Sequence, residues 1–379
     1  FRTPWAFGWK MPCLWTPCLA LLGLVAAERQ PIVGILSSPL KLPGARSWDG
    51  MSWIWATYVR TLSDVGAEVV PLLPHAGLDS LRQKLSEVDA VLLPGGEDDA
   101  GVHGVAYPDL MMQAIQVIYD EATKSKDLPV WGTCMGFQAL CVAASGDPSL
   151  VVPTAGTVGK DIPLQFTEAA RSSKIFGGAP EPVLNELRRH NSTLNFHTYG
   201  VLEESFFEDR IRGFKLLAVD RDAQGKEFGA LMEHASLPIF GSQFHPELYH
   251  AWASEEDLSV REPLREENSA NMYLMRFFVE QARKFSRASS RALEPLLITS
   301  YPESQPPFAI FGPTFSKILP PNTDLRGWVF NATSPVSSVE LDLAVSEFAA
   351  AQQPQGTMPL TAWAAAAVAT MLLFGMSLL

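Results

Sequence analysis

Short apolar runs alternate with helical patterns along the first third of the chain. The runs are bounded by glycine or proline, as expected for strands that are buried on both faces: residues 31–36, 67–73, 88–94 and 128–132. Between them, apolar residues recur at helical spacing: residues 52–66, 77–88 and 108–126. This alternation predicts right-handed crossovers and a mostly parallel sheet with helices on both faces. In such a sheet, we expect the chemistry at the carboxyl ends of the strands.

A cysteine stands between two glycines directly after the fourth predicted strand, in the segment 132–136 with the sequence GTCMG. This pattern is the cysteine counterpart of the nucleophile elbow, a strained turn between a strand and a helix. The glycines let the backbone bend, and the following helix directs its first N–H groups at the sulfur, which favours the thiolate. Cys134 is therefore the candidate nucleophile.

A nucleophilic cysteine needs a base, and the chain has seven histidines. His245 directly follows the apolar strand pattern of LPIFGSQFHPELYH, and Pro246 fixes the turn after it. We expect His245 to take the thiol proton and later to protonate the leaving amine, while Glu247 accepts from the other imidazole N–H and fixes the tautomer. Taken alone, the segment FHPE could also be a plain polar turn.

Composition limits the class of protein. A chain of 379 residues with 47% hydrophobic and 18% charged residues has room for one large or two ordinary folded domains. Its formal net charge of −12, without a stripe of Lys or Arg, disfavours nucleic acid as a partner. We expect neither a cofactor nor a metal ion.

Residues 1–27 are predicted to be a secretory signal peptide, because an apolar run ends there in small residues and is followed by polar ones. A buried first helix is the alternative, but Pro12 and Pro17 would interrupt it. Removal of the signal leaves Cys134 and Cys141 in an oxidising compartment. Seven residues along a helix place their Cα atoms about 10 Å apart, which is too far for a disulfide. Cys141 is predicted to be a small core residue.

Several motifs resemble those of known enzymes. Three motifs resemble those of the class I glutamine amidotransferase domains: PVWGTCMGFQAL, GSQFHPE and LLPGGEDD. Four further segments are similar to the γ-glutamyl hydrolase family: IVGIL, SWIWATYVRTLSDVGAEVVPL, LNFHTYG and NMYLMRFFVEQARK. The resemblance covers residues 30–300. It implies a flavodoxin-like three-layer α/β/α sandwich with a mostly parallel central sheet. It also implies a cysteine-dependent hydrolase that cleaves the γ-glutamyl bonds of folate (pteroyl) poly-γ-glutamates through a thioester.

Carried over by position, the resemblance makes Cys134 the nucleophile, His245 the base and Glu247 the orienting residue. His197, in the segment NFH, matches a further family histidine near the substrate with an undefined supporting role. The oxyanion hole would consist of the backbone N–H groups of Gly96 and Met135.

A polyglutamate substrate also implies cations that bind its carboxylates, for which Arg46, Arg171 and Lys174 are candidates. Two alternatives stay open at this point. The chain could be a glutaminase-type amidotransferase subunit that delivers ammonia to a partner, or a non-catalytic surface binding protein on the same fold. A homodimer is possible.

The domain organisation predicted after the signal is a catalytic domain over 28–300, a Pro-rich stalk over 301–359 and an uncharged hydrophobic tail over 360–379. The tail is long enough to span a bilayer. Small residues and an uncharged spacer before it favour a GPI-attachment signal over a transmembrane anchor. We therefore expect a protein of the secretory pathway that is held at the cell surface, or secreted, or sent to the lysosome or vacuole.

Two sequons, at Asn191 and Asn331, are predicted glycosylation sites in a chain that enters the secretory pathway.

Overall fold

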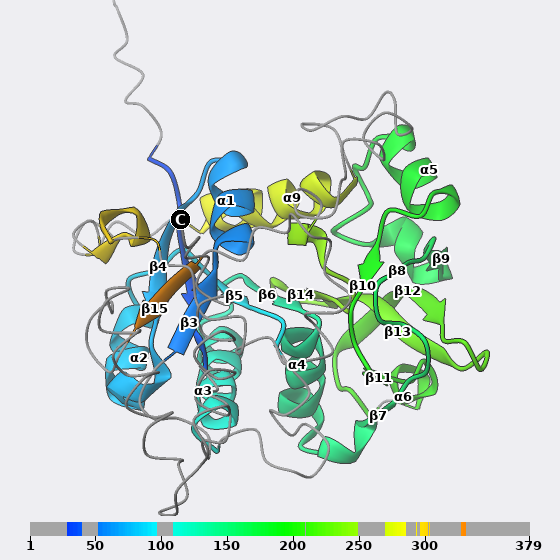
Figure 1. Cartoon of the computed structure of the whole chain (residues 1–379), viewed down its shortest axis with the longest axis horizontal. Coiled ribbons are helices and arrows are strands. Elements are labelled where there is room, and N and C mark those ends of the chain that lie inside the picture. The colour runs from blue at the N-terminus through cyan, green and yellow to red at the C-terminus, as the bar shows by residue number, and fades with distance from the viewer. Residues whose placement is uncertain are drawn as a thin grey trace, which may run out of the picture.

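The computed structural model describes residues 29–39, 52–96, 109–208, 210–248, 270–285, 293, 296–301, 303 and 327–330. Its centre is an eight-stranded sheet in the order β4-β1-β5-β6-β14-β13-β12-β9 (Figure 1). The parallel strands are β1 (Ile32–Leu36), β4 (Glu68–Leu72), β5 (Ala90–Leu93), β6 (Val130–Thr133) and β14 (Ile239–Ser242). The antiparallel edge consists of β13 (Glu227–His234), β12 (Phe214–Arg221) and β9 (Gln165–Phe166). Numbered along the chain, the parallel strands lie in the order 2-1-3-4-5, which is the flavodoxin-like arrangement.

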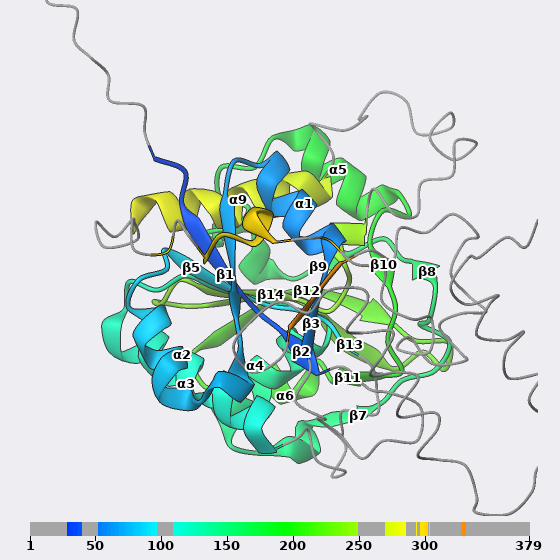
Figure 2. The ribbon, with the colours of Figure 1, turned by 60° about the vertical axis from the view of Figure 1, so that its left-hand side comes forward.

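Helices cover both faces of the sheet (Figure 2). One layer contains α1 (Ala56–Asp64), α5 (Glu181–Arg189) and α9 (Ala270–Lys284); the other contains α2 (Leu78–Leu85), α3 (Asp109–Ser125) and α4 (Met135–Ser145). Strand β1 is continuously apolar because it packs against helices on both faces. Val33 and Ile35 lie in the core with α1, α5 and α9, and Ile32 and Leu36 lie in the core with α2, α3 and α4, so every side chain is buried. The predicted three-layer α/β/α architecture is confirmed.

Shorter elements complete the described part of the chain. The small strands are β7 (Val151–Pro153), which pairs with β11 (Tyr199–Val201), and β8 (Lys160–Asp161), which pairs with β10 (Leu194–Asn195). The short helices are η1 (Pro74–Ala76), η3 (Pro148–Leu150), η4 (Glu168–Ser172), α6 (Glu204–Phe207), η5 (Pro246–Leu248) and η8 (Ile298–Ser300). Of the residues described, none belongs to a helix long and apolar enough to cross a membrane. The predicted signal peptide and the tail 360–379 lie outside the described residues.

The helix predicted over 52–66 begins later than expected. Ser52–Trp55 form strand β3, which pairs with β2 (Ser38–Pro39) and β15 (Gly327–Phe330), and α1 begins at Ala56. The apolar residues of SWIW fit a strand as well as a helix, so the local pattern could not decide between them. Pairing with a segment far along the chain makes it a strand.

The folded domain also extends beyond its predicted end at residue 300. Residues 301–359 were expected to form an extended stalk, but Gly327–Phe330 are strand β15, and Trp328, Val329 and Phe330 are buried. The indole Nε1 of Trp328 donates to the carbonyl of Tyr301 over 3.1 Å. At least this part of the Pro-rich region therefore belongs to the core; residues 331–359 lie outside the described chain.

Candidate active site

Cys134 lies at the turn between β6 and α4, in a strained backbone conformation. Its φ of 52° and ψ of −106° are unusual for a residue with a side chain. Such a conformation costs about 1–3 kcal/mol and persists only where its surroundings enforce it. Here the amide of Cys134 donates to the carbonyl of Ser242 on β14 over 2.7 Å, which ties the turn to the neighbouring strand. The strand-to-helix turn that the sequence predicted is present.

The two glycines of the motif let this turn pack tightly. A Cβ atom at Gly132 would lie 2.6 Å from the carbonyl carbon of Gly136. One at Gly136 would overlap the carbonyl oxygen of Leu93 on β5. The spacing G-x-C-x-G therefore lets α4 start directly over β5 and β6.

The thiol of Cys134 is almost fully buried, with 2% of the residue exposed. Its Sγ lies 4.0 Å from the carbonyl oxygen of Phe196 and 3.7 Å from Nε2 of Gln243. Gln138 donates to Oε1 of Gln243 over 3.2 Å and to the carbonyl of Tyr199 over 2.8 Å, so Gln243 directs its NH₂ group at the sulfur. Gln243 thus places a hydrogen-bond donor beside the sulfur of Cys134.

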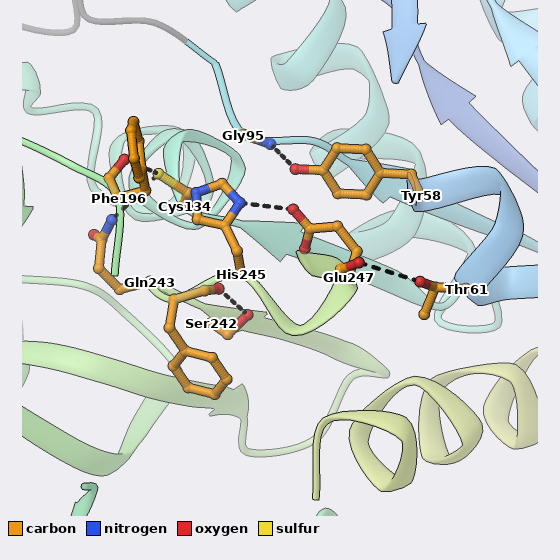
Figure 3. A network of polar contacts seen from close by, with 10 residues as sticks. Tyr58, Thr61, Gly95, Cys134, Phe196, Ser242, Gln243, His245 and Glu247 are labelled. Atoms are coloured by element: carbon orange, nitrogen blue, oxygen red, sulfur yellow. Dashed lines mark hydrogen bonds and ion pairs between the residues drawn. The ribbon is translucent and has the colours of Figure 1, made fainter. Parts of the chain in front are cut away.

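His245 follows β14 and is held by Glu247 in η5. Nδ1 of His245 and Oε1 of Glu247 are 2.6 Å apart, and because a carboxylate only accepts, Nδ1 carries the proton. The other ring nitrogen, Nε2, is buried without a hydrogen-bond partner in the described chain and points towards Cys134 (Figure 3). Burial by itself lowers the pKa of His245, but the Glu247 carboxylate and the Cys134 sulfur outweigh it, so the pKa is raised. The imidazole is therefore oriented and readily protonated.

Tyr58 on α1 lies beside His245 and Glu247 (Figure 3), although the sequence pattern did not indicate a role for it. Its hydroxyl accepts from the N–H of Gly95 over 2.7 Å (Figure 3). Burial raises its pKa well above the usual range, and the negative charge of Glu247 raises it further. In the sequence, Tyr58 cannot be told from an ordinary core aromatic of an amphipathic helix.

The two residues expected to supply the oxyanion hole lie side by side. A Cβ atom at Gly96 would overlap the end of the Met135 side chain. Met135 is the first residue of α4, so its N–H has no acceptor within the helix. The glycines after β5 thus reach the start of α4 beside Cys134.

His197 is buried and bound at both ring nitrogens. Nε2 lies 3.0 Å from Oδ1 of Asn195, and Nδ1 lies 3.3 Å from the hydroxyl oxygen of Thr154. Its ring also packs edge-on against Phe228, with centroids 5.0 Å apart. Burial lowers the pKa of His197 to about 3, and the nearby His245 contributes to the decrease. His197 is therefore a neutral ring that is fixed in place near the proposed base.

Of the three cations that were candidates for binding substrate carboxylates, two lie in the described part of the chain. The ammonium of Lys174 donates to the carbonyls of His234 and Leu237 over 2.7 and 2.8 Å, so it ties the turn between β13 and β14. Arg171 lines a surface pocket together with Phe166 and Arg188, which stack on each other at 4.8 Å. Arg46 lies outside the described residues.

The remaining predicted residues are placed as follows. Cys141 is fully buried in α4, which confirms it as a core residue, and burial raises its pKa. Both described cysteines are free thiols. Asn191 is exposed after α5, and Asn331 lies outside the described residues. Within the described ranges, no cluster of histidine, cysteine or acidic side chains could hold a metal ion.

Comparison with known proteins agrees with the motifs. Residues 50–258 match the family model of the class-I glutamine amidotransferases. Gamma-glutamyl hydrolase of Mus musculus is 32% identical over 268 residues, which cover 68% of this chain and 80% of the mouse protein. Gamma-glutamyl hydrolase B of Dictyostelium discoideum is 29% identical over 259 residues, which cover 67% of this chain and 72% of that protein. The solved structure of PurLQS from Thermotoga maritima has a TM-score of 0.38 and 15% identity over 65% of this chain and 97% of that chain.

Proposed function

The chain belongs to the class-I glutamine amidotransferase family and is similar to its γ-glutamyl hydrolases, and we propose that it hydrolyses the γ-glutamyl bonds of folate poly-γ-glutamates. Cys134 is the nucleophile and His245 is the general acid and base. Glu247 orients the imidazole and stabilises its protonated form. The observation that carries this proposal is the arrangement of His245, whose Nδ1 is held by Glu247 at 2.6 Å while Nε2 faces Cys134 without another partner among the described residues.

In the first half of the reaction, Nε2 of His245 takes the thiol proton and the sulfur of Cys134 attacks the γ-carbonyl carbon. Negative charge develops on the carbonyl oxygen, and the backbone N–H groups of Gly96 and Met135 stabilise it. The N–H of Gly95 is bound to Tyr58, which supports the assignment of this role to Gly96. The imidazolium then protonates the leaving amine, the C–N bond breaks, and a γ-glutamyl thioester remains on Cys134.

In the second half, water replaces the amine. His245 takes one proton from the water as its oxygen attacks the thioester carbon, and the C–S bond breaks. The thiolate is then protonated and the product carries a free γ-carboxylate. Gln243 supports both halves, because its NH₂ group lies 3.7 Å from the sulfur and stabilises the anion that attacks and later leaves.

Mass spectrometry of the products from a synthetic pteroyl penta-γ-glutamate tests reaction, substrate and cutting position together. We expect shortened pteroyl glutamates and free glutamate or γ-glutamyl peptides with the unchanged protein, and none with Cys134→Ala. An intact substrate after prolonged incubation would refute the proposal. Release of ammonia from free glutamine without cleavage of the peptide would instead identify a glutaminase.

We also propose that the protein enters the secretory pathway and carries a glycan at Asn191. The apolar segment within residues 1–27 supports this proposal, and so does the exposure of Asn191. A glycan at Asn331 and a GPI anchor that replaces residues 360–379 stay predictions from the sequence. A shift in mobility after peptide N-glycosidase treatment tests the glycans, with Asn191→Gln and Asn331→Gln to assign them. Release from membranes by a phosphatidylinositol-specific phospholipase tests the anchor.

A further inference from the structure

His197 is the first of three buried polar side chains that are linked to one another. His197 follows β10, Asn195 ends that strand, and Asp220 lies on β12; the three residues are 6%, 0% and 0% exposed. Oδ1 of Asn195 lies 3.0 Å from Nε2 of His197, and Nδ2 of Asn195 lies 3.4 Å from Oδ2 of Asp220. The hydrolysis proposed above assigns no role to Asn195 or Asp220. A buried carboxyl group needs a reason, because burial without full hydrogen bonding is costly.

The neighbours of Asn195 determine which way its amide points. Its Nδ2 faces the carbonyl oxygen of Thr193 at 3.2 Å as well as Asp220, and both groups can accept a hydrogen bond. The NH₂ group must therefore be on that side, and the amide oxygen must face His197. Because this oxygen only accepts, Nε2 of His197 carries the proton, and Nδ1 accepts from the hydroxyl of Thr154. Asp220 thus helps to select one tautomer and one orientation of the His197 ring.

The orientation of His197 matters for the nucleophile because of the residue before it. The carbonyl oxygen of Phe196 lies 4.0 Å from Sγ of Cys134. The hydroxyl of Thr157 donates to the carbonyl of His197 on the other side. The ring and the backbone of His197 therefore fix the segment that forms one wall around the thiol.

We propose that Asp220 is a positioning residue of this enzyme: through Asn195 it fixes the tautomer and orientation of His197, and so the place of the Phe196 carbonyl beside Cys134. The proposal rests on the hydrolysis proposed above only for its kinetic consequence. Burial raises the pKa of Asp220 to about 7. In the protonated form, Oδ1, which has no partner in the described chain, can carry the proton while Oδ2 still accepts from Asn195. The acceptor, not the charge, is the required feature.

Two variants of Asp220 separate the acceptor from the charge. Asp220→Asn keeps an acceptor oxygen and removes the charge. Asp220→Leu keeps the branched shape and removes the acceptor. If the leucine variant does not fold, Asp220→Ala is used in its place. Val219→Ala, on the same strand, is the control for a lost buried contact outside the polar chain. The measurements are the ¹⁵N NMR shifts of the His197 ring in histidine-labelled protein, the rate of Cys134 alkylation by iodoacetamide, and kcat and KM for a pteroyl penta-γ-glutamate.

In Asp220→Leu, we expect the His197 signal of the single Nε2–H tautomer to be lost and Cys134 alkylation to change. Misplacement of reacting groups by about 1 Å can lower the reaction rate by about 100-fold, so kcat should fall by about 10- to 100-fold. KM should change by less than about twofold, because Asp220 does not touch the substrate. Asp220→Asn and Val219→Ala should keep the tautomer and most of kcat.

An unchanged tautomer and kcat in Asp220→Leu would overturn the proposal, and so would an Asp220→Asn variant as impaired as the leucine variant. If the unchanged protein hydrolyses no γ-glutamyl bond, the proposed function fails, but the tautomer and the alkylation rate still decide the role of Asp220.

Discussion

Gly95 lies directly against the imidazole of His245. A Cβ atom at position 95 would lie 2.7 Å from Cε1 of His245 and 3.3 Å from Cβ of Cys134. The same glycine donates its N–H to Tyr58. The segment after β5 therefore sets the space available to the proposed nucleophile and base, in addition to supplying Gly96 for the oxyanion hole.

Gly95→Ala is expected to lower kcat/KM by about 100-fold, because the new methyl group displaces the imidazole from Cys134 and a shift of about 1 Å can have this effect. The fold should persist, since the clash involves the edge of a side chain and not backbone atoms. Steady-state kinetics and circular dichroism measure the two effects. The control is Gly178→Ala, where a Cβ atom would meet no atom within 4 Å and activity should be unchanged. Activity in Gly95→Ala equal to that of the control would contradict the close approach.

Tyr58→Phe removes the acceptor of the Gly95 N–H and should lower kcat by about tenfold or more, since loss of order in the adjacent oxyanion segment weakens stabilisation of the transition state. Leaving this amide without a partner should also cost about 1–3 kcal/mol of unfolding free energy. Urea unfolding and steady-state kinetics give the two values.

The matched control for Tyr58→Phe is Tyr273→Phe on α9. The hydroxyl of Tyr273 donates to the carbonyl of Ile175 over 2.7 Å. This variant should lose stability and keep kcat. Equal losses of kcat in both variants would show that Tyr58 acts through general stability.

The parallel sheet could be predicted, and a candidate nucleophile and base could be named, because each depends on a local sequence pattern. The elbow occupies five consecutive residues, and Glu247 follows His245 by two positions. Gln243 and Asn195 could not be found in this way, because their function depends on strands that meet only in the folded chain. Strand β3 shows the same limit, since SWIW becomes a strand through β15, which lies far along the chain. Local patterns thus indicate candidate reacting groups, whereas the residues that surround them are brought together only by tertiary pairing.

Removal of the Cys134 side chain should reveal the strain at the elbow. Both Cys134→Ala and Cys134→Gly should be inactive, but the glycine variant should be the more stable by about 1 kcal/mol, because a φ of 52° suits glycine and costs other residues about 1–3 kcal/mol. Urea unfolding measures the difference. The corresponding pair at Cys141, inside α4, should show the reverse order, since alanine is favoured over glycine in a helix by about 1 kcal/mol. The same order at both positions would argue against strain at Cys134.

Asp220→Asn should become more stable relative to the unchanged protein as the pH rises from about 4 to about 7. Burial raises the pKa of Asp220 to about 7, above the value of 3.8 for an unperturbed carboxyl. In this window the folded protein holds a proton on Asp220 that the unfolded chain has released, so this group makes the stability of the unchanged protein fall with rising pH. The slope is at most about 1.4 kcal/mol per pH unit for one proton. Asparagine does not titrate, so the difference in unfolding free energy between the two proteins, measured in urea at several pH values, should grow towards pH 7. A difference that is constant from pH 4 to pH 7 would mean that Asp220 ionises in the folded protein as readily as in the unfolded chain.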